Sequence, residues 1–169
     1  HRLSSAASDV YKRQGLGSEA ATVTDSSVSA SDLNTLNTNT DYNITVNATA
    51  ISGSLSDVST LYDNKAADSD ADTDGFTGLG NEAITLTDTG SIAADTLLTV
   101  AQANSAGTVD ASNAGTITGT AEQIIDAYDD STITEASDVA LTVNTANSGT
   151  ATLTPVSYTH LTLPTITGV

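Results

Sequence analysis

Apolar residues alternate with threonine in several short segments of the chain. Residues 21–24 read Ala-Thr-Val-Thr, and residues 84–87 read Ile-Thr-Leu-Thr. A period of two predicts strands with one buried face and one solvent-exposed face. Strands covered on both faces would instead be apolar throughout. We expect further strands of this kind at residues 44–48, 50–53, 109–111, 116–119, 141–144 and 151–154.

Helical patterns follow several of these strands. At residues 120–123 a Thr is followed three positions later by a Gln, which is the signature of a capping box at a helix start. Ser29 and Ser54, each followed three positions later by Asp, give weaker forms of the same signal. Apolar residues then recur at intervals of three and four, which places them on one helix face. The expected buried stripes are Leu55, Val58, Leu61 and Tyr62; Ala93, Leu97, Val100 and Ala101; and Ala121, Ile124, Ile125 and Tyr128.

One segment of the chain occurs twice. Residues 15–25 read GLGSEAATVTD, and residues 78–88, 63 positions later, read GLGNEAITLTD. Self-similarity at a fixed distance is typical of repeat architectures. We therefore divide the chain into repeat 1 (15–77), repeat 2 (78–134) and a partial repeat 3 (135–154), in which a turn at residues 147–149 replaces the helix.

The alternation of strands and helices predicts the fold class. We expect an α/β solenoid of stacked strand–helix repeats with a parallel sheet, in which helices line the back. No such unit can bury its apolar face alone, so each depends on its neighbours. Exposed Thr, Asn and Asp would form ladders along the stack. The alternative is an all-β sandwich or β-solenoid array, in which residues 121–128 would be a loop.

Composition restricts the core and the partners. Leu, Ile, Val and Phe number 35 of 169 residues, with one Phe and no Trp, which favours a core one side chain deep. The net charge of −17 argues against binding to nucleic acid or to an anionic membrane surface. No apolar run reaches the ~20 residues of a membrane span, so we expect no membrane insertion. The absence of Cys excludes disulfides and thiolate metal sites.

The two ends differ in character from the middle. Residues 1–14 hold three of the four basic residues, and residues 155–169 hold both Pro residues. Both ends resemble translated sequencing-adapter runs at the margins of open reading frames from metagenomic assemblies. We expect them to be artefactual tails on a fragment and leave them out of the fold. Both His residues, His1 and His160, lie there, so no His-based chemistry is expected.

The sharpest candidate site is an acidic loop that precedes Gly75. Alternating carboxylates followed by Gly suit the wrapping of oxygen ligands around calcium. An EF-hand loop needs Glu at position 12, whereas here Asn81 is at 12 and Glu82 at 13. The sequence therefore predicts at most a weak extracellular calcium site, and the alternative is a solvated acidic loop. The candidate ligands are Asp68, Asp70, Asp72 and Asp74.

No catalytic constellation stands out between the two ends. Residues 15–154 contain no Cys and no His, which excludes Ser–His and Cys–His nucleophile systems there. The acids follow no catalytic signature. We expect no enzyme activity, and no cofactor other than calcium.

At residues 78–88 (GLGNEAITLTD) and 115–122 (GTITGTAE) the chain resembles repeats of long, acidic, extracellular or cell-surface proteins of marine bacteria and cyanobacteria, which are adhesin-like. The resemblance covers roughly residues 15–134. It implies a non-catalytic stalk, surface-layer or adhesin segment that is secreted or on the bacterial cell surface. Its expected partners are neighbouring repeats of the same chain, and cell-surface polysaccharide or another cell. The alternative function is a calcium-dependent binding module that uses the loop at residues 68–74.

Overall fold

The structure is a computed structural model that describes residues 20–65 and 75–144. Over these residues the chain is an α/β structure with parallel sheets, four helices and no closed barrel. The elements in chain order are β1 (Ala21–Val23), β2 (Ser27–Ser29), α2 (Ala30–Asn37), β3 (Ile44–Val46), β4 (Ala50–Gly53), α3 (Leu55–Asp63), β5 (Phe76–Thr77), β6 (Ala83–Leu86), β7 (Ser91–Ala93), α4 (Ala94–Ala103), β8 (Thr108–Ala111), β9 (Thr116–Gly119), α5 (Ala121–Asp129), β10 (Ile133–Glu135) and β11 (Ala140–Val143).

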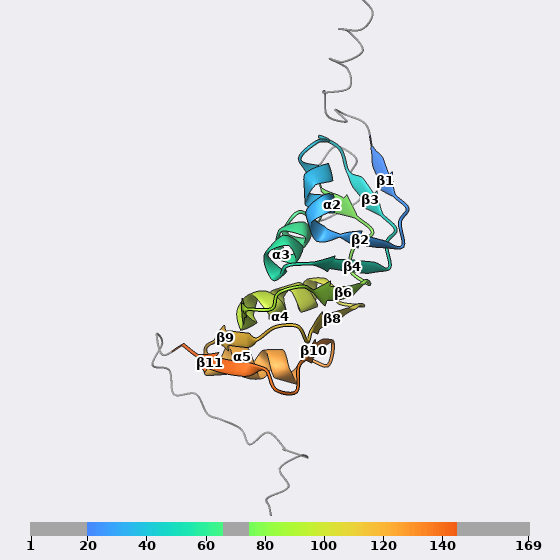
Figure 1. Cartoon of the computed structure of the whole chain (residues 1–169). Helices are drawn as coiled ribbons and strands as arrows, with labels where there is room; N and C mark the ends of the chain where they lie inside the picture. Colours follow the sequence, from blue (N-terminus) through green and yellow to red (C-terminus); the bar gives the residue numbers. More distant parts are fainter. Residues whose placement is uncertain (1–19, 66–74, 145–169) are drawn as a thin grey trace, which may run out of the picture.

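The strands form three sheets in which all neighbours are parallel. The central sheet has the order β10-β8-β6-β4-β2, and the two outer sheets have the orders β1-β3-β5 and β11-β9-β7. Figure 1 shows the strands stacked in one direction, with the helices beside them. Each successive pair of helices from α2 to α5 is in contact. The sequence predicted one parallel sheet, so the division into three is a correction.

The register of the central sheet aligns side chains of one kind. On each of the five strands one inward-pointing apolar residue is in register with its equivalent on the neighbouring strand. The polar residue after it in the sequence is aligned in the same way. The inward set is Val28, Ile51, Ile84, Val109 and Ile133. The polar set is Ser29, Ser52, Thr85, Asp110 and Thr134. The alternation is therefore confirmed in the central sheet, and a polar row of Ser, Thr and Asp runs along it. The expected Asn is absent from this row, and β11 is exposed at all four residues. In an outer sheet the Thr77 hydroxyl donates to the Thr45 hydroxyl at 3.3 Å.

Side-chain caps define three of the helix starts, as predicted. Ser29 accepts a hydrogen bond from the Asp32 amide, and Ser54 accepts one from the Asp57 amide. At the start of α5 the capping box is complete. Helix α4 has Ala93 at its N-cap and no side-chain cap, so its buried stripe begins at Ala94 instead of Ala93.

The predicted stripe on α5 is partly wrong. Its counterpart on α3 is buried as expected, with Tyr62 only 7% exposed. On α5 the buried residues are Ile124 and Ala127, and Tyr128 is 41% exposed. The reason is position in the stack, because α3 lies between α2 and α4, whereas α5 contacts α4 at the end of the described row of helices.

Four short strands were not predicted. Strands β2 and β7 occupy segments that the sequence presents as polar bends, and β5 and β10 lie between the predicted helices and the next strand. Each has two or three residues and one large apolar side chain at most, which is too little for a period to be recognised. The four helices rule out the all-β alternative. The expected strand at 151–154, the turn at 147–149 and the tails at 1–14 and 155–169 lie outside the described residues.

The turn before β6 depends on glycine. Gly78 has a φ of 88° and Gly80 a φ of 129°, in the region that side-chain-bearing residues rarely adopt. A Cβ on Gly78 would also clash with the carbonyl oxygen of Val46. Leu79, between the two glycines, is buried. The turn therefore packs the start of segment 78–88 directly against the end of β3.

The Gly78→Ala substitution is expected to lower the free energy of unfolding by about 2 kcal/mol or more, because it adds backbone strain and a clash. Urea unfolding followed by circular dichroism measures it. Gly90→Ala is the control, since a Cβ there meets nothing within 4 Å, and its expected effect is below about 1 kcal/mol. Equal midpoints for the two variants would contradict the role of this turn.

Candidate functional site

The predicted calcium ligands Asp68, Asp70, Asp72 and Asp74 lie outside the described residues. Over residues 20–65 and 75–144, no three or more His, Cys, Asp or Glu side chains are grouped so that they could hold a metal ion. Glu82, which sequence spacing places at position 13 of the loop, is fully buried and hydrogen-bonded elsewhere. Glu82 is therefore not a calcium ligand of the acidic loop but part of a buried hydrogen-bond network with Tyr62.

The structure brings helix α3 and segment 78–88 together around the Glu82 carboxyl group. Its Oε2 atom accepts hydrogen bonds from the Tyr62 hydroxyl at 2.7 Å and from the amides of Gly80 at 2.9 Å and Asn81 at 3.1 Å. Its Oε1 atom is buried and has no hydrogen-bond partner. Burial of a carboxyl group is costly unless such bonds compensate it. The three donors therefore fix Glu82 against the last turn of α3.

Asn104 holds the main chain of the same residue. Its side chain is buried at the end of α4. It accepts from the Glu82 amide at 3.2 Å and donates to the Glu82 carbonyl at 2.9 Å. It also donates to the Thr108 carbonyl at 3.3 Å. One amide side chain thus joins the start of β6 to the start of β8.

Lys65 adds a positive charge close to this junction. It is the one basic residue within 20–65 and 75–144. Its Nζ atom donates to the carbonyl oxygen of Ala103 at 3.2 Å, at the C-terminal end of α4. A cation there is favoured by the helix dipole. This bond ties the end of α3 to the end of α4.

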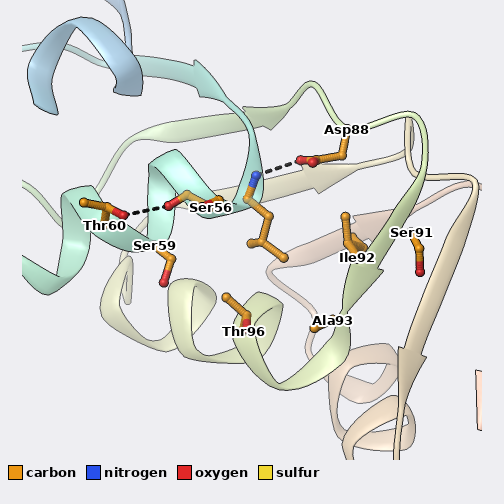
Figure 2. A pocket seen from close by; sticks show the side chains of 9 residues that line it. Ser56, Ser59, Thr60, Asp88, Ser91, Ile92, Ala93 and Thr96 are labelled. Atoms are coloured by element: carbon orange, nitrogen blue, oxygen red, sulfur yellow. Dashed lines mark hydrogen bonds between the residues drawn. The ribbon is translucent and has the colours of Figure 1, made fainter. Parts of the chain in front are cut away.

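Asp88, at the other end of segment 78–88, reaches the start of α3. Its Oδ2 atom accepts a hydrogen bond from the Leu55 amide at 2.7 Å, drawn in Figure 2. Leu55 is the first residue of α3, where amides lack helical partners and the helix dipole favours negative charge. Segment 78–88 therefore contacts α3 at both ends, through Glu82 and Asp88.

A cavity of about 360 Å³ opens beside Asp88, between α3 and the β7–α4 segment. Figure 2 shows hydroxyl side chains around it. Asp88 is the one ionisable residue in its lining, and one of its carboxyl oxygens already caps α3. General acid–base catalysis with paired groups would need a second ionisable residue here. The lining consists of Leu55, Ser56, Ser59, Thr60, Asp88, Ser91, Ile92, Ala93 and Thr96.

Several titrating groups are perturbed. Burial raises the pKa of Tyr62 strongly, and its hydrogen bond to Glu82 and the charge there raise it further. Burial, and then the charge of Glu135, raise the pKa of Tyr128. Burial also raises the pKa of Glu135. In contrast, hydrogen bonds from Ser112 lower the pKa of Asp110.

Sequence reasoning did not assign Glu82, Asn104 or Asp88 to this junction. A signal for the two acids existed, because both copies of the repeated segment carry Glu at the fifth position and Asp at the eleventh. No comparable signal marks Asn104.

Comparison of the chain with protein-family models, with curated proteins and with solved structures gave no match. None of the described helices is long and apolar enough to span a membrane.

Removal of the Tyr62 hydroxyl in Tyr62→Phe is expected to cost about 1.5–3 kcal/mol at neutral pH, since a buried carboxyl group loses a donor. The pKa of Tyr62 is raised in the folded state above its unfolded value of about 10. The corresponding stability is therefore present below pH ~10 and is lost as the pH rises further. Urea unfolding between neutral pH and pH ~11 should show a steep alkaline loss in the parent chain and a shallower one in Tyr62→Phe.

Tyr128→Phe is the matched control, because Tyr128 occupies the same repeat position but is 41% exposed, whereas Tyr62 is 7% exposed. It should keep the neutral-pH stability and most of the alkaline loss. Superimposable pH profiles for the parent chain and Tyr62→Phe would disprove the buried contact.

Calcium binding by the acidic loop at residues 68–74 can be tested by its effect on the stability of the whole chain. With a Kd of ~10⁻⁴–10⁻³ M, calcium at ~10 mM should stabilise the fold by about 1.4–2.7 kcal/mol. Titration calorimetry and thermal unfolding should both respond. The double substitution Asp70→Asn/Asp72→Asn should abolish the response, whereas Asp41→Asn, at an exposed position outside the loop, should keep it. No heat and an unchanged Tm in the parent chain would eliminate the calcium module.

Proposed function

We propose that the chain is a segment of an α/β solenoid with a non-catalytic, structural role in a secreted or cell-surface bacterial protein. The observation that carries this proposal is the recurrence of one pairing scheme. Strands β1, β3 and β5 pair in order, as do β6, β8 and β10. Likewise β2, β4 and β6 pair in order, as do β7, β9 and β11. Each scheme begins once in repeat 1, at β1 or β2, and once in repeat 2, at β6 or β7.

Strand β6 belongs to both schemes, and this supports an open array. It is the last strand after β2 and β4 and the first before β8 and β10. Each repeat therefore supplies five strands, some of which complete one sheet while the others begin the next sheet. In a longer array the three-stranded outer sheets would grow to five strands by pairing with neighbouring repeats. A chain with this arrangement extends without closing on itself, as a stalk or fibre requires.

The use of the polar residues also favours a structural role. The buried acid Glu82 and the helix-capping acid Asp88 both serve contacts between successive units. The aligned outward residues Ser29, Ser52, Thr85, Asp110 and Thr134 of the central sheet are hydroxyl-bearing or acidic, and the net charge is −17. Such a surface is hydrated and repels like-charged chains. It suits an extracellular segment whose partners are neighbouring repeats, cell-surface polysaccharide or another cell.

Tandem chains test the proposal. Chains that contain one, two or three copies of residues 15–134, joined without a linker, are compared by small-angle scattering. The length of the particles should grow by the same amount with each added copy. Their Tm should rise toward a plateau, because each added repeat covers its neighbour. A matched set with a flexible Gly/Ser linker between copies should show no such rise. Equal Tm values in the linker-free set, or compact particles in it, would refute the solenoid array.

A further inference from the structure

The cavity beside Asp88 arises from a difference between successive units. After β4 the chain enters α3 through the single residue Ser54, whereas after β6 it continues through residues 87–90 and β7 before α4 begins. Strand β6 pairs with β4, but within the described residues β7 pairs with β9 alone. The other edge of β7 therefore meets the start of α3 instead of a strand, and the cavity of about 360 Å³ lies between them.

This cavity lies in the middle of the stack. Its walls come from α3 and from residues 88–96, and α3 and α4 lie between α2 on one side and α5 on the other. Strands β9 and β11 lie on the paired side of β7. Units added to the array would extend that sheet beyond β11, so they would leave the free edge of β7 and the cavity uncovered.

Small hydroxyl side chains make up most of the lining. They come from α3, β7 and α4, and Figure 2 shows Ser59 and Thr96 directed into the space between the two helices. Within the described residues, the hydroxyls of Ser56, Ser59 and Ser91 form no hydrogen bond with the protein. Each of these groups can therefore both donate to a ligand and accept from it.

The fold itself does not require these hydroxyls. Helix α5 occupies the same repeat position as α3 and has the same length. At the fifth helix position α3 has Ser59, whereas α5 has Ile125. At the second position Ser56 is matched by Glu122. Bulky and charged side chains are thus compatible with this helix, and the small hydroxyls of α3 are particular to the cavity.

One carboxylate and two apolar side chains complete the site. Asp88 accepts from the Leu55 amide through Oδ2, and within the described residues its Oδ1 atom has no hydrogen-bond partner. Leu55 and Ile92, which are 5% and 4% exposed, supply an apolar wall. No basic residue lines the cavity, so Asp88 would repel an anion. An uncharged ligand rich in hydroxyl groups matches this lining.

We propose that the cavity binds a neutral sugar residue of a polysaccharide. Hydroxyl groups of the sugar donate to Oδ1 of Asp88 and exchange hydrogen bonds with Ser56, Ser59 and Ser91, while its C–H face packs on Ile92. The cavity is at the lower end of the ~300–1,000 Å³ range of small-molecule sites, which suits one sugar unit. The proposal rests on the proposed function, which includes polysaccharide as a partner, and it names the class of polysaccharide and where it binds.

Backbone amide chemical shifts of the whole chain test the site. Methyl glycosides of glucose, galactose and mannose are added separately to ~50 mM, above the Kd on the order of 1–10 mM expected for so small a ligand. At least one of them should shift the amides of α3 and β7. Galacturonate, an anion of similar size, should shift none of these amides. No shift with any of the three glycosides, or equal shifts with galacturonate, would overturn the proposal.

Two variants locate the binding. Ser59→Ile places in the cavity the side chain that α5 carries at the same position, and it should weaken binding by about tenfold or more through steric overlap with the sugar. Ser91→Ala removes one hydroxyl without adding bulk and should weaken binding about threefold. The control is Thr35→Ile, at an exposed position of α2 outside the cavity, which should bind as the parent chain does. Unchanged binding in Ser59→Ile would overturn the proposal.

The sugar titration and the tandem chains separate this site from the array. Glycoside binding by a chain whose tandem copies fail to lengthen would remove the array and leave the site. Tandem chains that lengthen while the glycosides cause no shift would remove the site and leave the array.

Discussion

The buried carboxyl group of Glu82 makes the two halves of the described structure depend on each other. An acid that is fully removed from water must find donors within the protein. Here one donor, Tyr62, comes from the last turn of α3, and the others are amides of the turn at Gly80. Asn104 fixes the main chain of Glu82 from the far side. Neither half can form this network alone, so a polar contact, and not only apolar area, sets how successive units fit.

A thin core explains why such a contact is needed. The strands have two to four residues, and each strand that has buried residues contributes only one or two side chains to the interior. The aligned ladder from Val28 to Ile133 is therefore continuous along the stack but only one side chain deep. Aliphatic side chains of similar shape would pack almost equally well if one unit were shifted by one strand position relative to the next. A hydrogen-bonded acid fits at one place, and we infer that Glu82 thereby helps to specify the register between units.

Local signals in the sequence were sufficient for most elements. Alternation predicted β3, β6, β8 and β9, and capping residues predicted the starts of α2, α3 and α5. The signals failed where the outcome depends on what lies next in space. Tyr62 and Tyr128 have the same local pattern, but only Tyr62 is covered by a following unit. Glu82 was considered as an acid beside a calcium loop, because spacing along the chain does not reveal a buried partner. The loop acids themselves remain a prediction.

The shared strand β6 has a consequence for how an array of this kind could end. In the proposed array each repeat would begin on the sheet that the previous repeat completes, as β6 does here, so backbone pairing alone would offer no natural stop. A stop must come from side chains. Val139 occupies the repeat position of Glu82, and the backbone pairs of β11 form without an acid there. Replacement of the acid by Val139 therefore leaves the strand in place but removes the acceptor that Glu82 provides for Tyr62. In the proposed array an acid at the position of Glu82 would therefore act together with the apolar ladder in holding the next unit.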